Sequence, residues 1–251
     1  MPRGGTRCPA EEHSATQREI HHADYPVWLC RRHRNFYPSL YRTYTTSITE
    51  TINRLAHGFL TLYETSCPEL PLAERLERVA QQDRAYATAL IHGVFADAHQ
   101  DPRVAGLAEH PRLMDTVTRL TTPWQLTGHI IRVRVNIPSF PQTRSPWHQD
   151  ATDPPSPIVL ACWIPLVDAT DANGTLEVLP GVYEEPYPHQ QTAEGKFYLP
   201  QDVLPDTPPR SLPCPAGDVL FLDRFLPHRT LPNRTTTIRW SLVMWLKGQR
   251  R

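Results

Sequence analysis

The chain has 251 residues, 39% of them hydrophobic, and its 26 basic side chains are balanced by 26 acidic ones. This length allows a substantial core within one domain, and the neutral charge argues against nucleic acid or an anionic membrane as a partner. Five scattered cysteines without Cys-x-x-Cys spacing argue against a disulfide framework and a structural zinc site. No apolar run approaches the about 20 residues of a membrane span, and no signal-like stretch opens the chain. We therefore expect a cytoplasmic protein that handles a small-molecule substrate; the sequence leaves its oligomeric state open.

The amino-terminal residues 1–46 are polar, rich in arginine and histidine, and without a sustained period. We expect a loosely ordered polar arm here, with a part in covering a pocket as the alternative. From residue 47 onward apolar side chains recur at helical spacing. The sequence therefore predicts a single domain over 47–251, with helical support over 47–122 and a β core over 123–251.

The helical part contains several predicted helices. Apolar residues predict a first helix over 47–62, and the segment 71–95 opens with a proline suited to a first helical turn. Two shorter helices are expected near 102–108 and 110–120.

After Pro123 the pattern becomes that of strands. The segment 124–137 alternates and is rich in β-branched residues. Further strand-like runs, separated by turn residues rather than helices, are 157–167, 174–180, 217–226 and 235–246. This organisation predicts a mainly β protein with flanking helices, built as an antiparallel jelly roll or cupin-like barrel.

One long connection interrupts these strands. Residues 181–216 are dense in proline and show little periodicity, which is typical of a functional lid or a mobile loop. We hypothesise that Tyr183, Tyr187 and Phe197 help to cover a substrate site, and a plain surface loop is the alternative.

Three His-x-Asp pairs, at 22–24, 99–101 and 148–150, are candidate halves of a metal site. A lone pair of this kind is a weak signal, so its context decides. The first lies in the polar arm. The second lies between predicted helices, where residues i and i+2 do not face each other. We therefore expect metal at the third pair alone.

His148 and Asp150 lie between two predicted strands. In extended backbone, positions i and i+2 project from the same face, so the imidazole and the carboxylate can converge on one ion. His228, at the end of the run "GDVLFLDRFLPHRT", is the expected third ligand. Two histidines and one carboxylate form the ligand set of non-haem Fe(II) oxygenases.

Arg239 follows His228 by eleven residues, in an otherwise apolar strand. A turn at "LPNR" would place it beside the strand of the metal ligand. A guanidinium buried there needs a carboxylate partner, and the far carboxylate of 2-oxoglutarate would serve. The alternatives are that Arg239 pairs with an acidic side chain of the protein or reaches solvent from a sheet edge.

Together these residues resemble the phytanoyl-CoA dioxygenase family of Fe(II)/2-oxoglutarate oxygenases. The resemblance covers roughly 124–247 and rests on four features: "WHQD", "NGTLEVLPG", "GDVLFLDRFLPHRTLPN" and the arginine eleven places past the distal histidine. It implies a double-stranded β-helix of the jelly-roll type. It also implies that the cofactor and cosubstrates are Fe(II), 2-oxoglutarate and O2.

The resemblance also assigns roles to residues. His148, Asp150 and His228 look like the iron ligands, Arg239 like the anchor of 2-oxoglutarate, and Thr230 like the hydroxyl that assists this arginine. Trp163 is expected either to line the cosubstrate pocket or to pack in the core. Arg134 and Asn136 alternate along one strand, and either they point into the barrel toward cosubstrate or product, or they face outward.

The expected reaction is oxidation of a small organic metabolite, such as one of specialised metabolism, by hydroxylation or a related outcome of C–H abstraction. Related halogenases carry Gly or Ala at the carboxylate position, so Asp150 argues against halogenation. No basic run in the sequence signals a pocket for the phosphates of CoA. The alternatives are a non-oxidative cupin-like metalloenzyme, acting as an isomerase or hydrolase, and a catalytically silent binding barrel.

Overall fold

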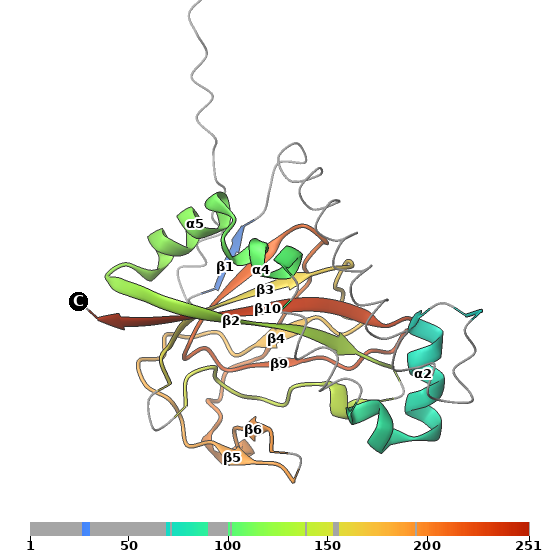
Figure 1. Ribbon diagram of the computed structural model, residues 1–251. Coiled ribbons are helices and arrows are strands. Elements are labelled where there is room, and N and C mark those ends of the chain that lie inside the picture. The colour runs from blue at the N-terminus through green and yellow to red at the C-terminus, as the bar shows by residue number, and fades with distance from the viewer. Residues whose placement is uncertain are drawn as a thin grey trace, which may run out of the picture.

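The computed structural model describes residues 27–30, 69–70, 72–89, 100, 102–138, 140–152, 156–193 and 195–250. Within these residues the protein is mainly β with few helices, as its sequence predicts (Figure 1). The helix expected over 47–62 and the His-x-Asp pairs at 22–24 and 99–101 lie outside the described residues.

The helices begin close to where the sequence predicts them. They are α2 (Leu72–Gln82), α4 (Pro102–Ala108) and α5 (Pro111–Thr121), and the short 3-10 turns Pro141–Thr143 and Gln201–Val203 follow later in the chain. The helix expected over 71–95 is interrupted at Asp83, and residues 84–89 are helical again. The Asp83 carboxylate accepts a 2.9 Å bond from the backbone N–H of Tyr86 and so caps this second piece. None of the helices in the described ranges is long and apolar enough to cross a membrane.

A five-stranded antiparallel sheet forms the centre of the structure, in the order β1-β8-β3-β10-β2. Its strands are β1 (Val27–Cys30), β2 (Trp124–Asn136), β3 (Ile158–Pro165), β8 (Val219–Asp223) and β10 (Arg239–Arg250). Four of them coincide with strand-like runs of the sequence. The exception, β1, lies inside the segment expected to be a polar arm and pairs with β8.

A smaller sheet has the order β7-β4-β9 and consists of β7 (Arg210–Leu212), β4 (Leu176–Val178) and β9 (His228–Thr230). The backbone N–H of Thr230 donates to the carbonyl of Ser145, and His148 and His228 form an antiparallel bridge. Residues 145–148 therefore extend this sheet beyond β9. The strands β5 (Gln190–Gln191) and β6 (Phe197–Tyr198) form a separate hairpin. Thus the segment expected to be irregular, 181–216, contains three short strands.

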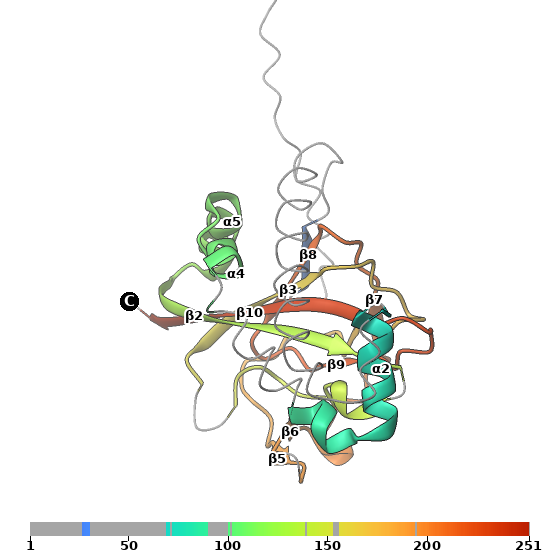
Figure 2. The same cartoon turned by 45° about the vertical axis from the view of Figure 1, so that its right-hand side comes forward.

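The two faces of the large sheet have different environments. Helices α4 and α5 lie on one side and the small sheet lies on the other (Figures 1 and 2). On β10, Leu242, Met244 and Leu246 join the apolar cluster that includes the helices. Val243 and Trp245 belong to the cluster that includes Leu176 and Val178 of β4, so these two point between the sheets. Arg239 and Ser241 precede Val243 by even numbers of residues along β10, so they are buried on this same inner face.

Candidate metal centre

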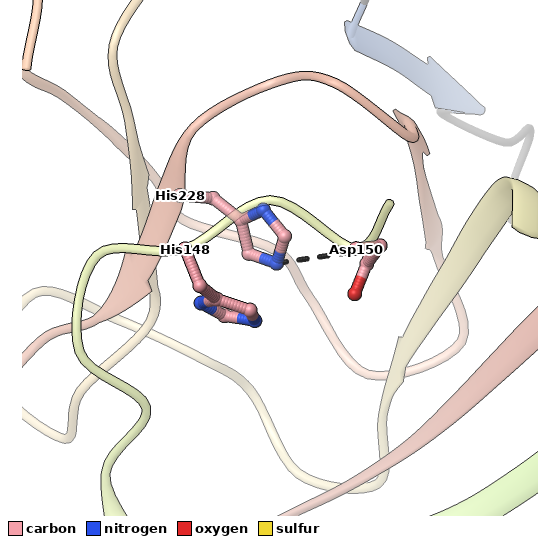
Figure 3. A group of neighbouring side chains, drawn as sticks. All are labelled: His148, Asp150 and His228. Carbon is pink, nitrogen blue, oxygen red and sulfur yellow. Dashed lines mark ion pairs between the residues drawn. The ribbon is translucent and has the colours of Figure 1, made fainter. Parts of the chain in front are cut away.

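Three side chains converge on the inner side of the small sheet (Figure 3). One ligand atom from each of His148, Asp150 and His228 lies within 4.8 Å of the other two. The bridge between residues 148 and 228 holds the two histidines side by side, with ring centroids 4.2 Å apart. Asp150, two positions after His148, projects toward the same point, as alternation in extended backbone predicts.

Each histidine has one nitrogen engaged by the backbone. Nδ1 of His148 lies 2.8 Å from the carbonyl oxygen of Pro146, and Nδ1 of His228 lies 3.0 Å from that of Leu226. A carbonyl oxygen can only accept, so both Nδ1 atoms carry a proton, and in a neutral imidazole of this tautomer the lone pair is on Nε2. Burial, and next the neighbouring His228, lower the pKa of His148 well below its usual value. This direction favours the neutral imidazole of His148, the form that binds metals.

The Asp150 carboxylate has two distinct environments. Its Oδ1 accepts a 2.6 Å hydrogen bond from the indole nitrogen of Trp245, whereas its Oδ2 is buried without a hydrogen-bond partner. Oδ2 lies 3.9 Å from Nε2 of His228. A buried carboxylate oxygen without a donor is costly, and a cation between it and the two histidines would remove that cost. The donor set therefore fits one divalent metal ion of the Fe(II) type.

Gln149, between the two ligands, points away from them and is 1% exposed. Its Nε2 donates to the carbonyl oxygens of Phe225 (2.5 Å) and Glu185 (3.3 Å), and its Oε1 accepts from the N–H of Tyr187 at 2.6 Å. Its own N–H donates to Nε2 of His189 at 3.1 Å. Gln149 thus connects the metal-ligand loop to the proline-rich segment 181–216.

Arg239 is 2% exposed and lies on the inner face of β10. Its Nε donates to the carbonyl oxygen of Gly174 at 3.1 Å, and Nη1 donates to Oγ of Ser241 at 2.7 Å. Among the described residues no carboxylate forms an ion pair with it, and burial lowers its pKa to about 9. Within the part of the chain that the structure describes, this guanidinium has neither the acidic partner nor the route to solvent that the sequence left open. It is a buried cation suited to a carboxylate ligand.

Trp163 and Asn136 lie next to this arginine. The guanidinium carbon of Arg239 is 5.2 Å from the centre of a Trp163 ring, and Asn136 pairs with Arg239 across the two strands. The Asn136 amide donates to the carbonyl oxygens of Leu231 (3.0 Å) and Gly174 (3.4 Å), and its Oδ1 is buried without a partner. Trp163 also belongs to the apolar cluster between the sheets and is 3% exposed, so it packs in the core beside Arg239.

Arg134 and Thr230 are the remaining candidate site residues. Thr230 follows His228 by two positions on β9 and therefore shares its face. The Arg134 guanidinium carbon lies 5.4 Å from the centre of a Trp245 ring, the indole that holds Asp150. Both residues line one cavity of about 940 Å³. Of the aromatic residues expected to cover the site, none lines this cavity, although Thr192 and Lys196 of the same segment do.

Sequence reasoning missed several contacts of the site. Trp245 and Ser241 share a face with Arg239 because they follow it by even numbers of residues in one strand, a signal that the sequence does contain. Gln149 and Gly174 carry no such signal, because their partners are distant in sequence. A Cβ atom at Gly174 would lie 2.0 Å from Nδ2 of Asn136 and 2.5 Å from the carbonyl oxygen of Leu231. Gly174 therefore permits the close approach of these chains.

Comparison with known proteins gives a family match. A sequence model described as phytanoyl-CoA dioxygenase (PhyH) matches residues 45–241. No curated protein matches the chain.

Several solved structures are similar to part of it. The non-heme alpha ketoglutarate dependent carbocyclase SnoK from nogalamycin biosynthesis has 25% identity over 62% of this chain and 64% of its own, with a TM-score of 0.47. AviO1 from Streptomyces viridochromogenes Tue57 has 23% identity over 59% and 61%, with a TM-score of 0.41. The epimerase SnoN, in complex with Fe3+, alpha ketoglutarate and nogalamycin RO, has 21% identity over 62% and 64%, with a TM-score of 0.48. The chain spans less than two thirds of the length of each of these proteins.

Proposed function

Since the chain belongs to the phytanoyl-CoA dioxygenase (PhyH) family of Fe(II)/2-oxoglutarate oxygenases, we propose that it oxidises a C–H bond of a small organic metabolite. One observation carries this proposal. Two histidine nitrogens and a carboxylate oxygen without a hydrogen-bond partner meet within 4.8 Å, and a buried arginine that pairs with no carboxylate of the described residues lies on the sheet that faces them. The proposed unit is one domain over 47–251, a double-stranded β-helix preceded by helices.

In this proposal Nε2 of His148, Nε2 of His228 and Oδ2 of Asp150 hold Fe(II). When bound, the iron centre supplies O2 activation at the expense of 2-oxoglutarate, which becomes succinate and CO2, and it supplies removal of a hydrogen atom from the substrate. The backbone carbonyls of Pro146 and Leu226 fix the tautomers of the two ligand histidines. Trp245 fixes the rotation of the carboxylate.

Arg239 is proposed to bind the distal carboxylate of 2-oxoglutarate. Ser241 and the carbonyl of Gly174 hold the guanidinium in place, and Trp163 lies beside it. Thr230 is proposed to assist this arginine with its hydroxyl. Asn136, which pairs with Arg239 across β2 and β10, has a buried Oδ1 without a hydrogen-bond partner. A non-oxidative metalloenzyme would have no use for a buried cation next to its metal ligands, so Arg239 favours the oxygenase.

Asp150 supports oxygen transfer or a related outcome rather than halogenation. Family members that halogenate replace this carboxylate by Gly or Ala, whereas here it is retained and held by Trp245. The proposed reaction is accordingly hydroxylation, or a desaturation, ring closure or epimerisation that begins with the same hydrogen abstraction. The groups that position the substrate decide among these outcomes.

Anaerobic addition of Fe(II) and then 2-oxoglutarate tests the proposal. A weak visible charge-transfer absorption should appear in the wild type and, at modest 2-oxoglutarate, be lost in Arg239→Gln. Arg119→Gln removes an exposed arginine on α5 that pairs with Asp115, and should leave the absorption unchanged. On admission of O2, succinate should form in step with O2 consumption. Absence of the absorption in the folded wild-type protein would exclude the proposed function.

A further inference from the structure

The cavity of about 940 Å³ next to the candidate metal centre has a strongly basic lining. Six of the lining residues are basic: Arg132, Arg134, Arg144, Lys196, Arg229 and Arg234. Among the described residues of the lining Glu177 alone is acidic, and it pairs with Arg229 at 2.6 Å. A neutral chain thus concentrates positive charge at one cavity. No run of basic residues in the sequence announces it, because these residues are spread over about a hundred positions of the chain.

Not all of these cations have the same role. The Lys196 ammonium donates to the carbonyl oxygens of Gln142 and Arg144, so it ties the β5–β6 hairpin to the segment after β2. Arg229 is neutralised by Glu177. In contrast, none of Arg134, Arg144 and Arg234 forms an ion pair with a described residue. These three are the cations that the cavity offers to a ligand.

Arg134 occupies the central position among them. It lies on the inner face of β2, opposite Ser241 of β10, and over the Trp245 ring. Its side chain is exposed, so a ligand in the cavity can reach its guanidinium. Arg132 lies two positions before it on the same face of β2, so two like charges adjoin and repel each other at the cavity wall. An oxyanion between or beside them would relieve that repulsion.

The metal centre does not itself account for this charge. In the proposed function the charges of Fe(II) and Arg239 are balanced by Asp150 and by the two carboxylates of 2-oxoglutarate. No anion of the centre is then left for Arg134, Arg144 and Arg234. The excess positive charge of the cavity therefore calls for a further anion, beyond the cosubstrate.

We infer that the cavity binds the substrate through an oxyanion, a phosphate or a carboxylate, held against Arg134, so that the substrate is an organic anion. This inference rests on the proposed function, whose substrate class it specifies. Guanidinium groups suit both oxyanions because they present paired N–H donors. A cavity of this size accommodates a metabolite together with its charged group.

The test uses the full chain loaded anaerobically with Fe(II) and saturating 2-oxoglutarate. Two matched probe pairs are titrated by calorimetry: benzyl phosphate against benzyl alcohol, and phenylacetate against phenylacetamide. Within each pair one compound is an anion and the other is neutral. The pair with the larger difference in affinity shows whether the cavity prefers a phosphate or a carboxylate. We expect the anion of at least one pair to bind about tenfold or more tightly than its neutral partner, as a charge-assisted contact implies.

Variants then locate the binding. In Arg134→Gln the preference for the anion should fall to about threefold or less, whereas Arg134→Lys should keep part of it, because the charge remains but the paired N–H donors are lost. Arg234→Gln changes an exposed turn residue and should lower the preference less. If Arg134→Gln does not fold, the Arg234→Gln variant still shows whether cations of the cavity hold the anion. Arg119→Gln, outside the cavity, should behave as wild type.

The outcomes separate this inference from the proposed function. Equal binding of anionic and neutral probes, or an anion preference that survives in both Arg134→Gln and Arg234→Gln, would overturn the inference. So would loss of the Fe(II)/2-oxoglutarate absorption in Arg134→Gln at modest 2-oxoglutarate, because Arg134 would then serve the cosubstrate. If the wild type shows no such absorption, the proposed function fails. An Arg134-dependent anion preference would still establish the cavity as an oxyanion site.

Discussion

The indole nitrogen of Trp245 donates a 2.6 Å hydrogen bond to Oδ1 of Asp150 and so leaves Oδ2 as the atom that faces the two histidines. Trp245 lies near the middle of the long strand β10, which pairs with both β2 and β3. The orientation of a carboxylate on a loop is therefore set by one of the most firmly held strands of the protein. The same strand contributes Arg239, six residues earlier on the same face.

We expect Trp245→Phe to weaken Fe(II) binding by about tenfold or more, since loss of an outer contact to a metal ligand usually costs that much. The phenyl ring keeps the apolar packing but has no N–H to hold Oδ1. Anaerobic equilibrium dialysis of Fe(II) measures the effect. Trp240→Phe, the same change on the opposite face of β10, is the control and should retain wild-type affinity. Equal affinities in both variants would show that the hydrogen bond does not orient the ligand.

Metal binding should stabilise the fold, because it compensates the buried Oδ2 of Asp150. At a free Zn(II) concentration about 100 times the dissociation constant, the gain is about 2.7 kcal/mol, seen as a rise of several degrees in the unfolding midpoint. Asp150→Asn should abolish this rise while leaving the metal-free protein as stable as the wild type, because the amide carries no buried charge. Thermal unfolding with EDTA and with Zn(II) compares the two. An undiminished rise in Asp150→Asn would exclude Asp150 as a ligand.

Gly174 is expected to be intolerant of any side chain. Its φ is +86°, and a Cβ atom would collide with the Asn136 amide and the carbonyl of Leu231. Gly195 has a similar φ of +78° but open space around its Cβ position. Gly195→Ala should therefore cost only the backbone term of about 1 kcal/mol, and Gly174→Ala about 2 kcal/mol or more beyond it.

Urea denaturation of both glycine variants measures this difference. Because Gly174 also supplies a carbonyl to Arg239, Gly174→Ala should in addition raise the 2-oxoglutarate concentration needed for half-maximal charge-transfer absorption. Equal destabilisation by the two substitutions would mean that the contact at Gly174 relaxes without cost.

The parts of this protein that could be predicted from sequence are the longer strands and the metal-ligand pair. The alternating run 124–137 predicted β2, apolar runs between turn residues predicted β3, β8 and β10, and the i, i+2 spacing of His148 and Asp150 predicted that both face one point. Strands of two or three residues, such as β5, β6 and β9, have too few positions to show alternation. They form because their neighbours hold them in place, so the sequence of the segment alone does not reveal them.

The contacts around the site could be predicted only in part, for a related reason. Trp245 follows Arg239 by an even number of residues, so the sequence predicts that both lie on the same face of the strand. It does not predict that Trp245 contacts Asp150. The basic cavity arises from residues of several segments that approach only in the folded chain. The hydrogen-bond partners of the Gln149 side chain lie 36, 38 and 76 residues after it, so no local pattern in the sequence indicates them.

Gln149 should hold the proline-rich segment against the metal-ligand loop. Gln149→Leu removes the acceptor of the Tyr187 N–H and the donor to the carbonyls of Glu185 and Phe225. We expect a loss of about 2 kcal/mol or more in stability, since buried polar groups lose their partners. The amide of Tyr187 should also exchange with solvent at least about tenfold faster, because its protection depends on this one side chain.

Hydrogen exchange read out by mass spectrometry on peptides around residue 187 follows the change, with Gln201→Leu on the exposed turn Gln201–Val203 as the control. A loosened segment also changes turnover if it covers the bound substrate. Gln149→Leu should then form succinate without a matching amount of oxidised product, whereas Gln201→Leu should remain coupled. Faster exchange with fully coupled turnover would mean that the segment is held by Gln149 but does not shield the reaction, and the lid hypothesis for 181–216 would be wrong.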